Sequence, residues 1–456
     1  MSRATATPTA SGAPGSVTAP GAAPAGVPSV AGAQAAPVAA GAASRRRAAL
    51  LARTAMEGTP GRMRLLGFVA ALAAAVFGII GATSLWSAAG ALDRADLNTQ
   101  QVVRIQGIYA DLVRADADAS NAFLVGGVED SAQRGDYDAA LARVASGITD
   151  AARAQPADSA ALGTLNTKVQ TYASTVEQAR VYNRQGQPVG AQYLNQASAS
   201  LRSDVLPVVD ALRKANSQRA DTEFAASRSR PALFLAGVAA LLVLVAIMVW
   251  LARRTHRYLN VSMGLGALLL LLTMGLGAVT LGGVGSQVSS VRDSDYRYTV
   301  AVASARTAAF DAKSNESLTL ISRGSGGAYE TAWTTQYATA FSALAALPAT
   351  AETKLKGDLS AYEALHKDIR KQDDSGEWDK AVASATKTGT GTANAAFAQF
   401  DADSAQSLAG YKAQTSASLT APIAWVTVLG WALLALCVGA ALLALRGMNE
   451  RVEEYR

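Results

Sequence analysis

The most pronounced pattern in the sequence is a set of four long runs of residues that carry no charge. These runs cover residues 65–92, 231–252, 261–285 and 422–445. Each run exceeds the roughly 20 apolar residues that cross a bilayer core of about 30 Å. The pattern therefore predicts four transmembrane helices in a protein of the plasma membrane.

Basic residues beside these runs predict which ends face the cytoplasm. The connector 253–260, between the second and third runs, holds three arginines and no acid. Residues 45–64 hold six arginines and a single acid, Glu57. Because Lys and Arg concentrate in short cytoplasmic loops, we expect the connector and both chain ends to be cytoplasmic. The two polar segments, 93–230 and 286–421, are then outside.

The first polar segment has the apolar spacing of packed helices. One stripe advances by alternate steps of three and four, through Leu162, Leu165, Val169, Tyr172, Val176 and Ala179. This spacing is typical of one face of a helix in coiled-coil-like packing. Gly and Pro breaks divide the segment into four predicted helices, 93–125, 137–153, 157–184 and 189–229. Because the first and last helices join membrane spans, the pattern predicts an antiparallel four-helix bundle standing on the membrane.

The second polar segment repeats the plan of the first, and we name 93–230 the first repeat and 286–421 the second repeat. In the third helices Leu165 corresponds to Leu355, Val169 to Leu359, Tyr172 to Tyr362, Val176 to His366 and Ala179 to Ile369. Ser120–Asn121 corresponds to Ser314–Asn315 in the first helices, and Tyr137 corresponds to Tyr329 in the second helices. Such an ordered series indicates a duplication. The predicted fold is an all-α membrane protein with four transmembrane helices and two tandem extracellular antiparallel four-helix bundles.

The two chain ends are predicted to be cytoplasmic tails. Residues 1–44 consist almost entirely of Ala, Pro, Gly, Ser, Thr and Val, and cannot bury a core. We therefore expect a disordered tail over 1–64 with a basic end. After the fourth span, residues 446–456 form a short tail of mixed charge.

Composition excludes several classes of function. The single Cys, Cys437, excludes an intrachain disulfide framework and a multi-cysteine metal site. With only two His, His256 and His366, and no legible nucleophile and base, we expect no catalytic site, no cofactor and no metal. The net charge of +6 is explained by arginines beside the spans, so no nucleic-acid partner is expected. The spans contain no acid, Lys or Arg, which disfavours transport.

Four polar residues are candidates for contact with a ligand or partner. Asn183 and Arg184 belong to the most distinctive polar cluster, at an end of the third helix that we place near the membrane. Asn121 and Asn315 lie near the predicted distal tips of the repeats. A solvated helix end is the simpler explanation for the first pair, and ordinary capping or turn chemistry is the simpler explanation for the other two.

Four further residues are candidates for signal relay. Pro231 and Pro422 open the returning spans, where proline kinks a continuous helix or starts a new one. Glu453 and Tyr455 lie in the short tail that the fourth span could move. The alternative is an ordinary anchoring tail.

The order of span, helical bundle and returning span resembles the sensory half of bacterial chemoreceptors and sensor kinases. The chain departs from them because the unit occurs twice and no HAMP, methyl-accepting, kinase or cyclase domain is expected at its cytoplasmic end. The tandem units, the Ala/Pro-rich tail and VYNRQGQPVGAQYL (181–194) resemble more closely a group of actinobacterial four-span membrane proteins. These work with a glutamine/glutamate-type extracytoplasmic binding lipoprotein and a soluble serine/threonine kinase.

The sequence thus predicts a non-enzymatic signalling receptor or adaptor. The resemblance implies an extracellular amino acid such as glutamate or glutamine as the stimulus, sensed directly or through the binding lipoprotein, and a kinase as the cytoplasmic partner. The lipid bilayer is a further partner, and a homo-oligomer is one assembly that the helices allow. The alternatives are a structural scaffold, or an accessory subunit of a transporter or cell-envelope complex.

Overall fold

The computed structural model describes residues 59–125, 131–228, 231–255 and 260–453. Within these ranges every regular element is helical. The prediction of a disordered tail falls mostly on residues 1–58, which lie outside the described residues, as does Tyr455. The helix that leads into the first apolar run is described from Thr59 onward.

The helices follow the chain order that the apolar and polar pattern predicts. In the first half they are α2 (Thr59–Val125), α3 (Ser131–Ala154), η1 (Pro156–Asp158), α4 (Ser159–Arg184), α5 (Val189–Ser200), η2 (Leu201–Val205), α6 (Leu206–Arg228) and α7 (Pro231–Thr255). In the second half they are α8 (Val261–Val291), η3 (Arg292–Tyr296), α9 (Arg297–Ile321), α10 (Gly327–Leu344), α11 (Ala349–Asp374), α12 (Trp378–Thr386) and α13 (Ala393–Glu453).

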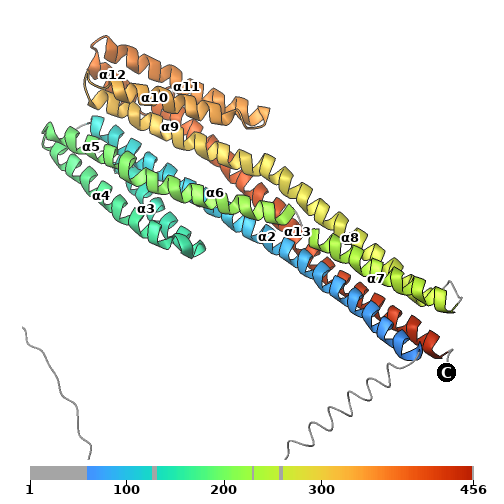
Figure 1. The fold of residues 1–456 in the computed structure, drawn as a ribbon. Helices are drawn as coiled ribbons and strands as arrows, with labels where there is room; N and C mark the ends of the chain where they lie inside the picture. Colours follow the sequence, from blue (N-terminus) through green and yellow to red (C-terminus); the bar gives the residue numbers. More distant parts are fainter. Residues whose placement is uncertain (1–58, 126–130, 229–230, 256–259, 454–456) are drawn as a thin grey trace, which may run out of the picture. The chain divides into compact units, whose positions relative to one another are not determined.

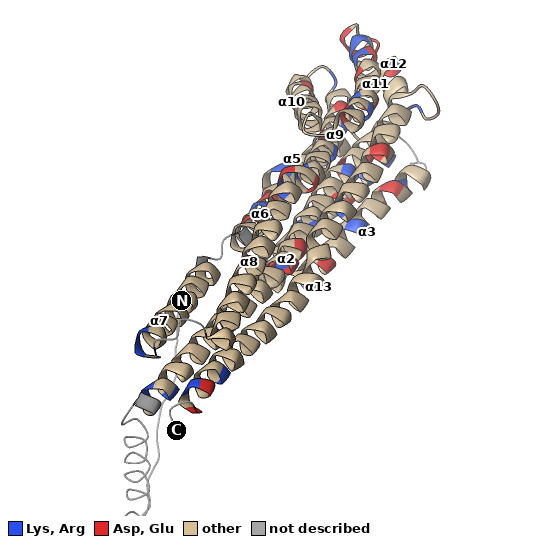
Figure 2. Cartoon of the chain, turned by 90° about the vertical axis from the view of Figure 1, so that its right-hand side faces the viewer, with Lys and Arg blue, Asp and Glu red and all other residues tan. Residues whose placement is uncertain are grey.

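Four of these helical stretches are long and apolar enough to cross a membrane, which identifies a multi-pass membrane protein. They lie in α2, α7, the α8–α9 stretch and α13. Large apolar side chains on them remain exposed, such as Phe68 at 60%, Leu235 at 66% and Val428 at 67%. Exposed apolar surface of this kind is what lipid tails cover. Figure 2 shows the uncharged lengths of these helices, with blue residues at the end near the C-terminus.

Small residues bring α2 and α13 into close contact within the apolar region. Gly67, Gly78 and Gly81 of α2 are buried. A Cβ added at these three positions would lie 2.9, 2.6 and 2.6 Å from side-chain atoms of Met448, Cys437 and Leu433, respectively. Because glycine lets helix backbones approach closely in a membrane, the small residues of the first span form a packing face against the fourth.

In the first repeat the helices run alternately away from the apolar region and back (Figure 1). The stripe on α4 is buried as predicted, and all six of its residues belong to one core cluster. Gly186 ends this helix with a φ of 65°, a conformation that a residue without Cβ adopts without strain. The fourth helix contains a π-helical turn, η2, between α5 and α6. Such turns are frequent at functional sites.

The second repeat differs from the first in its fourth helix. Instead of one continuous helix, α12 ends at Thr386 and α13 begins at Ala393. The intervening residues include Gly389 and Gly391, whose φ values are 103° and 76°. These are left-handed conformations that favour glycine, so this sequence turns the chain where the first repeat continues as a helix.

The second helices of the two repeats align one helical turn away from the predicted register. Tyr137 of α3 is fully buried, whereas its predicted counterpart Tyr329 is only partly buried. The buried aromatic residue of α10 is Trp333, four residues later. The predicted register was wrong: the buried positions Tyr137, Val144 and Ile148 correspond to Trp333, Ala340 and Leu344, because burial follows the apolar face of the helix and not the matching Tyr–acid pair.

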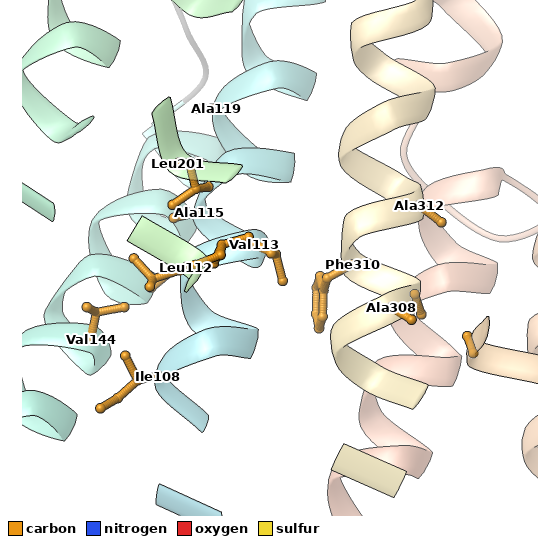
Figure 3. Close-up of a cluster of buried hydrophobic side chains, with 14 of the residues drawn as sticks. Ile108, Leu112, Val113, Ala115, Ala119, Val144, Leu201, Ala308, Phe310 and Ala312 are labelled. Atoms are coloured by element: carbon orange, nitrogen blue, oxygen red, sulfur yellow. The ribbon is translucent and has the colours of Figure 1, made fainter. Parts of the chain in front are cut away.

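One continuous core joins the two repeats, where two separate cores were expected. The same buried cluster contains Val169 of the first repeat and Leu359 of the second. Figure 3 shows Val113 of α2 and Phe310 of α9 pointing toward one another between the repeats. Both side chains are at most 4% exposed. The repeats are therefore packed against each other through their first helices.

Candidate functional site: the contact between the two repeats

The predicted cluster at the end of the third helix lies at the end of the molecule away from the spans. Asn183 donates from Nδ2 to the carbonyl oxygen of Phe123, 3.1 Å away, near the end of α2. Its expected location near the membrane was wrong. The helix α2 runs away from the spans, α3 runs back toward them and α4 runs away again. The end of the third helix must therefore lie at the tip farthest from the spans (Figure 1).

A cavity of about 680 Å³, the tip cavity, opens at this distal end. Asn183, Gln187 and Phe123 line it from the first repeat, and Arg323 and Trp378 line it from the second. The Arg323 guanidinium lies 3.8 Å from the centre of the Trp378 ring, a cation–π contact. Arg184 is not among the lining residues.

A second cavity, the inter-repeat cavity, lies closer to the spans and measures about 260 Å³. The first repeat contributes Arg114, Asp118 and Asn121 from α2 and Gln133 and Asp136 from α3. The second repeat contributes Phe310 and Lys313 from α9, Phe397 and Asp401 from α13, and neighbouring residues. The predicted candidate Asn121 is therefore part of a cavity wall.

Asn315, the counterpart of Asn121, has a different environment. Its side chain is buried and donates from Nδ2 to the carbonyl oxygen of Asp311, 2.8 Å away on the same helix. It lines neither cavity. The structure thus separates the two asparagines that the repeat pattern paired.

A buried carboxylate, Asp116, lies at the centre of the contact between the repeats. Within its own repeat it accepts hydrogen bonds from Tyr172 Oη at 3.2 Å, Ser198 Oγ at 2.6 Å and Arg202 Nη1 at 3.1 Å. It also accepts from Ser314 Oγ of the second repeat at 2.6 Å. Asp116 is completely shielded from solvent, so these four donors replace the water that an ionised carboxylate would otherwise need.

Arg202 connects this carboxylate to the second repeat. Its Nη2 atom donates to Asp311 Oδ1 at 2.8 Å and to Ser314 Oγ at 3.0 Å. Burial alone would lower the pKa of Arg202, but the carboxylates of Asp116 and Asp311 outweigh burial and raise it. The guanidinium is therefore held charged between two acids from different repeats. Arg202 lies in the π-helical turn η2, which alters the helix where the second repeat is contacted.

A second ionic contact between the repeats involves Asp401 of α13. Its carboxylate pairs with Arg114 of α2 at 2.9 Å and with Arg306 of α9 at 2.6 Å. The sequence analysis did not identify this contact or the Asp116 network. The available signal was a set of charged residues at buried positions of the first helices. Periodicity alone does not pair an acid with a base about 100 to 290 residues away.

Two of the predicted relay residues, Pro231 and Pro422, stand at the junctions between repeats and spans. Pro231 is the first residue of α7 after residues 229–230, which lie outside the described ranges. Pro422 lies inside α13, which continues through it. Proline leaves the carbonyl four residues earlier without its helical donor. Gln287 of α8 supplies that donor, from Nε2 to the carbonyl oxygen of Ser418 at 2.8 Å.

At the opposite end of the spans, the connector contacts the C-terminal end of α13. Asn260 caps α8 and also donates from Nδ2 to the carbonyl oxygen of Gly447 at 2.8 Å. Ser262 donates to Glu450 at 3.0 Å. Glu453 is the last residue of α13 and is exposed. The start of α8 and the end of α13 therefore contact each other at this end of the spans.

The chemistry of these contacts is that of ion pairs and hydrogen bonds that position helices. Within the described ranges, no group of three or more His, Cys, Asp or Glu residues is placed to hold a metal ion. The lining of the inter-repeat cavity combines charged and polar side chains with apolar ones.

Comparison with known proteins places a sensor domain in the first repeat. Residues 91–225 match the family model described as actinobacterial sensor domain. No curated protein and no solved structure matches the chain. The matched segment begins at the outer end of the first apolar run and ends just before α6 does. The first repeat is therefore similar to an actinobacterial sensor domain, which suggests a role in sensing and signalling.

Proposed function

We propose that the chain is a non-enzymatic transmembrane sensor. Its two repeats form tandem antiparallel four-helix bundles outside the cell, receive a stimulus there, and pass a change in helix position through four spans to a cytoplasmic partner. The stimulus is a nutrient amino acid, sensed directly or through a binding lipoprotein. The partner is a serine/threonine kinase, as the resemblance to four-span actinobacterial signalling proteins implies.

One observation supports this role most directly, namely that α13 runs from the second repeat to the C-terminal tail without interruption. It has 61 residues, and at a rise of about 1.5 Å per residue it is roughly 90 Å long. Its first part carries Asp401, which pairs with both repeats, and its last part contacts the connector. A shift of the repeats relative to each other therefore moves a rigid rod that reaches the opposite end of the protein.

The apolar region is suited to transmit such a shift as a rigid movement. Its helices contain no charged group that would have to rearrange within the bilayer, and the α2–α13 contact is made by small residues. Rigid-body displacement of packed helices is a common form of signal transmission. The exposed end of α13, together with the neighbouring Ser262, is the surface that would present the result to a partner.

The test is affinity purification of the tagged chain in mild detergent, from cells with and without added extracellular glutamate or glutamine. We expect a binding protein and a kinase to be recovered in amounts that depend on the amino acid. Deleting residues 449–456 should leave membrane insertion intact and abolish recovery of the kinase. The matched control Arg446→Gln removes the Arg446–Glu450 pair but keeps the tail, and should retain the kinase.

Other outcomes would contradict the proposal in specific ways. Recovery of cell-wall machinery independent of amino acids would identify a scaffold, and recovery of permease components would identify an accessory transporter subunit. If the chain without residues 449–456 still bound its partner and responded as the full chain does, the output would lie in the connector or the N-terminal segment.

A further inference from the structure

The tip cavity is lined by an arginine, Arg323, whose side chain is exposed. Within the described part of the chain, Arg323 forms no ion pair and no hydrogen bond, and its contact is with the Trp378 ring. By contrast, Arg114 of the inter-repeat cavity pairs with Asp401 at 2.9 Å. A guanidinium has five N–H donors, so those of Arg323 are available to a bound molecule.

The contact with Trp378 positions this guanidinium. Its central carbon, Cζ, lies 3.8 Å from the centre of the Trp378 ring. The indole is itself held in place, because Nε1 donates to the carbonyl oxygen of Leu320 at 2.8 Å. The ring thus fixes the position of a positive charge at the cavity without supplying an acceptor for its N–H groups.

The backbone at Arg323 is in a conformation that side chains rarely adopt. Among the described residues it is the one residue other than glycine with a positive φ, which is 32°. Glycine adopts this left-handed region without steric cost, and strained positions of this kind cluster at binding and switch regions. An arginine where glycine would be free of strain indicates that its side chain is used.

Most of the remaining wall of the tip cavity is apolar. Its volume of about 680 Å³ lies within the roughly 300–1,000 Å³ of pockets that hold small molecules. The larger apolar side chains come from the ends of α2 and α9 and from α12, namely Phe123, Leu124, Val125, Ile321, Trp378 and Val382. The cavity therefore combines one positioned guanidinium with space for an apolar group.

We propose that the tip cavity binds a small carboxylate with an apolar body. The planar fork of Arg323 matches the two oxygens of a carboxylate. The fork matches phosphate as well, but Asp379 on the same wall repels a doubly charged group more than a singly charged one. Asp379 lies in the first turn of α12, where the positive end of the helix dipole favours an acid.

A ligand in this cavity would join the two repeats at the end farthest from the spans. The first repeat lines the cavity through α2, α5 and the segment that follows α4, and the second repeat lines it through α9, α12 and Arg323. The inference rests on the proposed function only for its role in signalling. Binding itself is measurable on the purified chain without any partner.

The experiment measures binding to the full chain in lipid nanodiscs by saturation-transfer NMR, with the signal from empty nanodiscs subtracted. The probes are 3-phenylpropionate, 3-phenylpropan-1-ol, 3-phenylpropylamine and 2-phenylethylphosphonate, which share an apolar body and differ in the polar group. We expect 3-phenylpropionate to bind at least about tenfold more tightly than the alcohol, because the alcohol offers Arg323 no charged acceptor. The amine should not bind, and the phosphonate should bind more weakly than the carboxylate.

Matched variants locate the binding at Arg323. Arg323→Gly removes the guanidinium and suits the backbone, so it should keep or raise the unfolding midpoint while weakening 3-phenylpropionate binding at least about tenfold. Arg323→Lys keeps the charge without the planar fork and should bind with intermediate affinity. Arg184→Gln alters an exposed arginine at the end of α4 that does not line the cavity, and should bind as the parent does. Should Arg323→Gly lose its helical circular dichroism, Arg323→Gln decides in its place.

Three results would overturn the inference. The first is that 3-phenylpropionate binds no better than the alcohol, and the second is that the phosphonate binds as tightly as the carboxylate or more tightly. The third is that the chain without the Arg323 guanidinium binds 3-phenylpropionate as the parent does. Each would leave the proposed sensor function intact if partner recovery still depended on an extracellular amino acid, so the two proposals fail independently.

Discussion

Both repeats place a buried tyrosine of the third helix against a carboxylate of the first helix, yet the two carboxylates stand at different positions. Tyr172 donates to Asp116 at 3.2 Å, and Tyr362 donates to Glu316 at 3.1 Å. Asp116 lies four residues before the Ser120–Asn121 pair begins, whereas Glu316 lies two residues after Ser314. The tyrosines of the two repeats thus correspond, but relative to the Ser–Asn pair the carboxylate of the second repeat lies six residues later than that of the first.

This difference in position changes which side chains contact the carboxylate in each repeat. Asp116 accepts hydrogen bonds from Arg202 of its own repeat and from Ser314 of the second repeat. Its network therefore extends across the contact between the repeats. Glu316 is bonded within its own repeat, by Lys313 at 2.6 Å and by His366 at 2.8 Å. Each of these two acids is thus neutralised by a cation of its own repeat, Arg202 or Lys313. Arg202 also pairs with Asp311 of the second repeat, so of the two networks the one around Asp116 links the repeats.

The structure describes the whole junction between the second repeat and its returning span. In the second repeat α13 continues through Pro422, and Gln287 compensates the carbonyl that the proline leaves without a donor. The second repeat is thus continuous with its returning span.

The largest expected effect concerns whether the two repeats lie on the same side of the membrane. Single cysteines at Ser159 in α4 and Ser360 in α11 should both react with an impermeant maleimide on intact cells, because both residues are exposed. A cysteine at Thr255, at the end of α7, should not react, because the connector is predicted to be cytoplasmic. The native Cys437 is buried in the apolar region and should give no background. A labelled Thr255 position, or labelling of only one repeat, would refute the tandem arrangement.

The next largest effect should come from the self-contained network of the second repeat. Glu316→Gln leaves Lys313, which is 5% exposed, without its carboxylate. Breaking a buried ion pair from one side costs about 3–5 kcal/mol, so the midpoint of denaturant unfolding should fall strongly. Asp116→Asn should cost less, because Arg202 keeps Asp311 as a partner.

A surface pair provides the control for this comparison. Glu377→Gln removes an exposed carboxylate paired with Lys380, and exposed pairs contribute no more than about 1 kcal/mol. The expected order of destabilisation is Glu316→Gln, then Asp116→Asn, then Glu377→Gln. If Asp116→Asn proved the most damaging, the interface network rather than the internal one would be the main source of charge compensation.

The positions of the helices and their buried faces can largely be predicted from the sequence, because buried residues recur periodically along a single helix. The four apolar runs, the stripe on α4 and its counterpart on α11 all appear where their spacing predicts them. Spacing reports which face of one helix is covered. It does not report which partner covers that face, so the single core that joins the repeats through Val113 and Phe310 was not predicted.

The candidate site was less predictable for a related reason. Asn121 and Asn183 were selected as polar residues at helix ends, and each lines a cavity. The cavities themselves are formed by residues up to about 280 positions apart, such as Asp118 and Phe397, whose proximity depends on how the repeats pack. The error in placing Asn183 was one of direction along the third helix, which follows from topology rather than from composition.

A smaller effect is expected at the junction of the second repeat. Gln287→Leu keeps the size of the side chain but removes the donor to the Ser418 carbonyl. A fully buried acceptor left unsatisfied costs about 1–3 kcal/mol, and the cost here is smaller because Gln287 and Ser418 are only half-buried. We expect a lower unfolding midpoint and weaker coupling between the stimulus and recovery of the partner. Pro422→Ala restores the backbone N–H, so Gln287→Leu should cost less in that background. An equal cost in both backgrounds would show that the glutamine acts elsewhere.

The smallest predicted effect is a pH dependence confined to the second repeat, where His366 replaces Val176. Burial alone would lower the pKa of His366, but hydrogen bonds to Glu316 and Glu330 outweigh burial and raise it. A raised pKa stabilises the folded state below the unfolded value of about 6.5, and this contribution is lost as pH rises through the folded pKa. The imidazole also stacks on Trp333 at 3.6 Å, which holds the ring in place for both hydrogen bonds.

Parent and His366→Val chains should therefore differ in the slope of stability against pH above about 6.5, with the parent losing more. Asp118, whose raised pKa of about 7 also removes stability as pH rises, is present in both chains and cancels in the difference. Unfolding midpoints measured at several pH values across this range provide the test. Parallel profiles would mean that the pKa of His366 is the same in the folded and unfolded states, so that its hydrogen bonds to Glu316 and Glu330 contribute no pH-dependent stability.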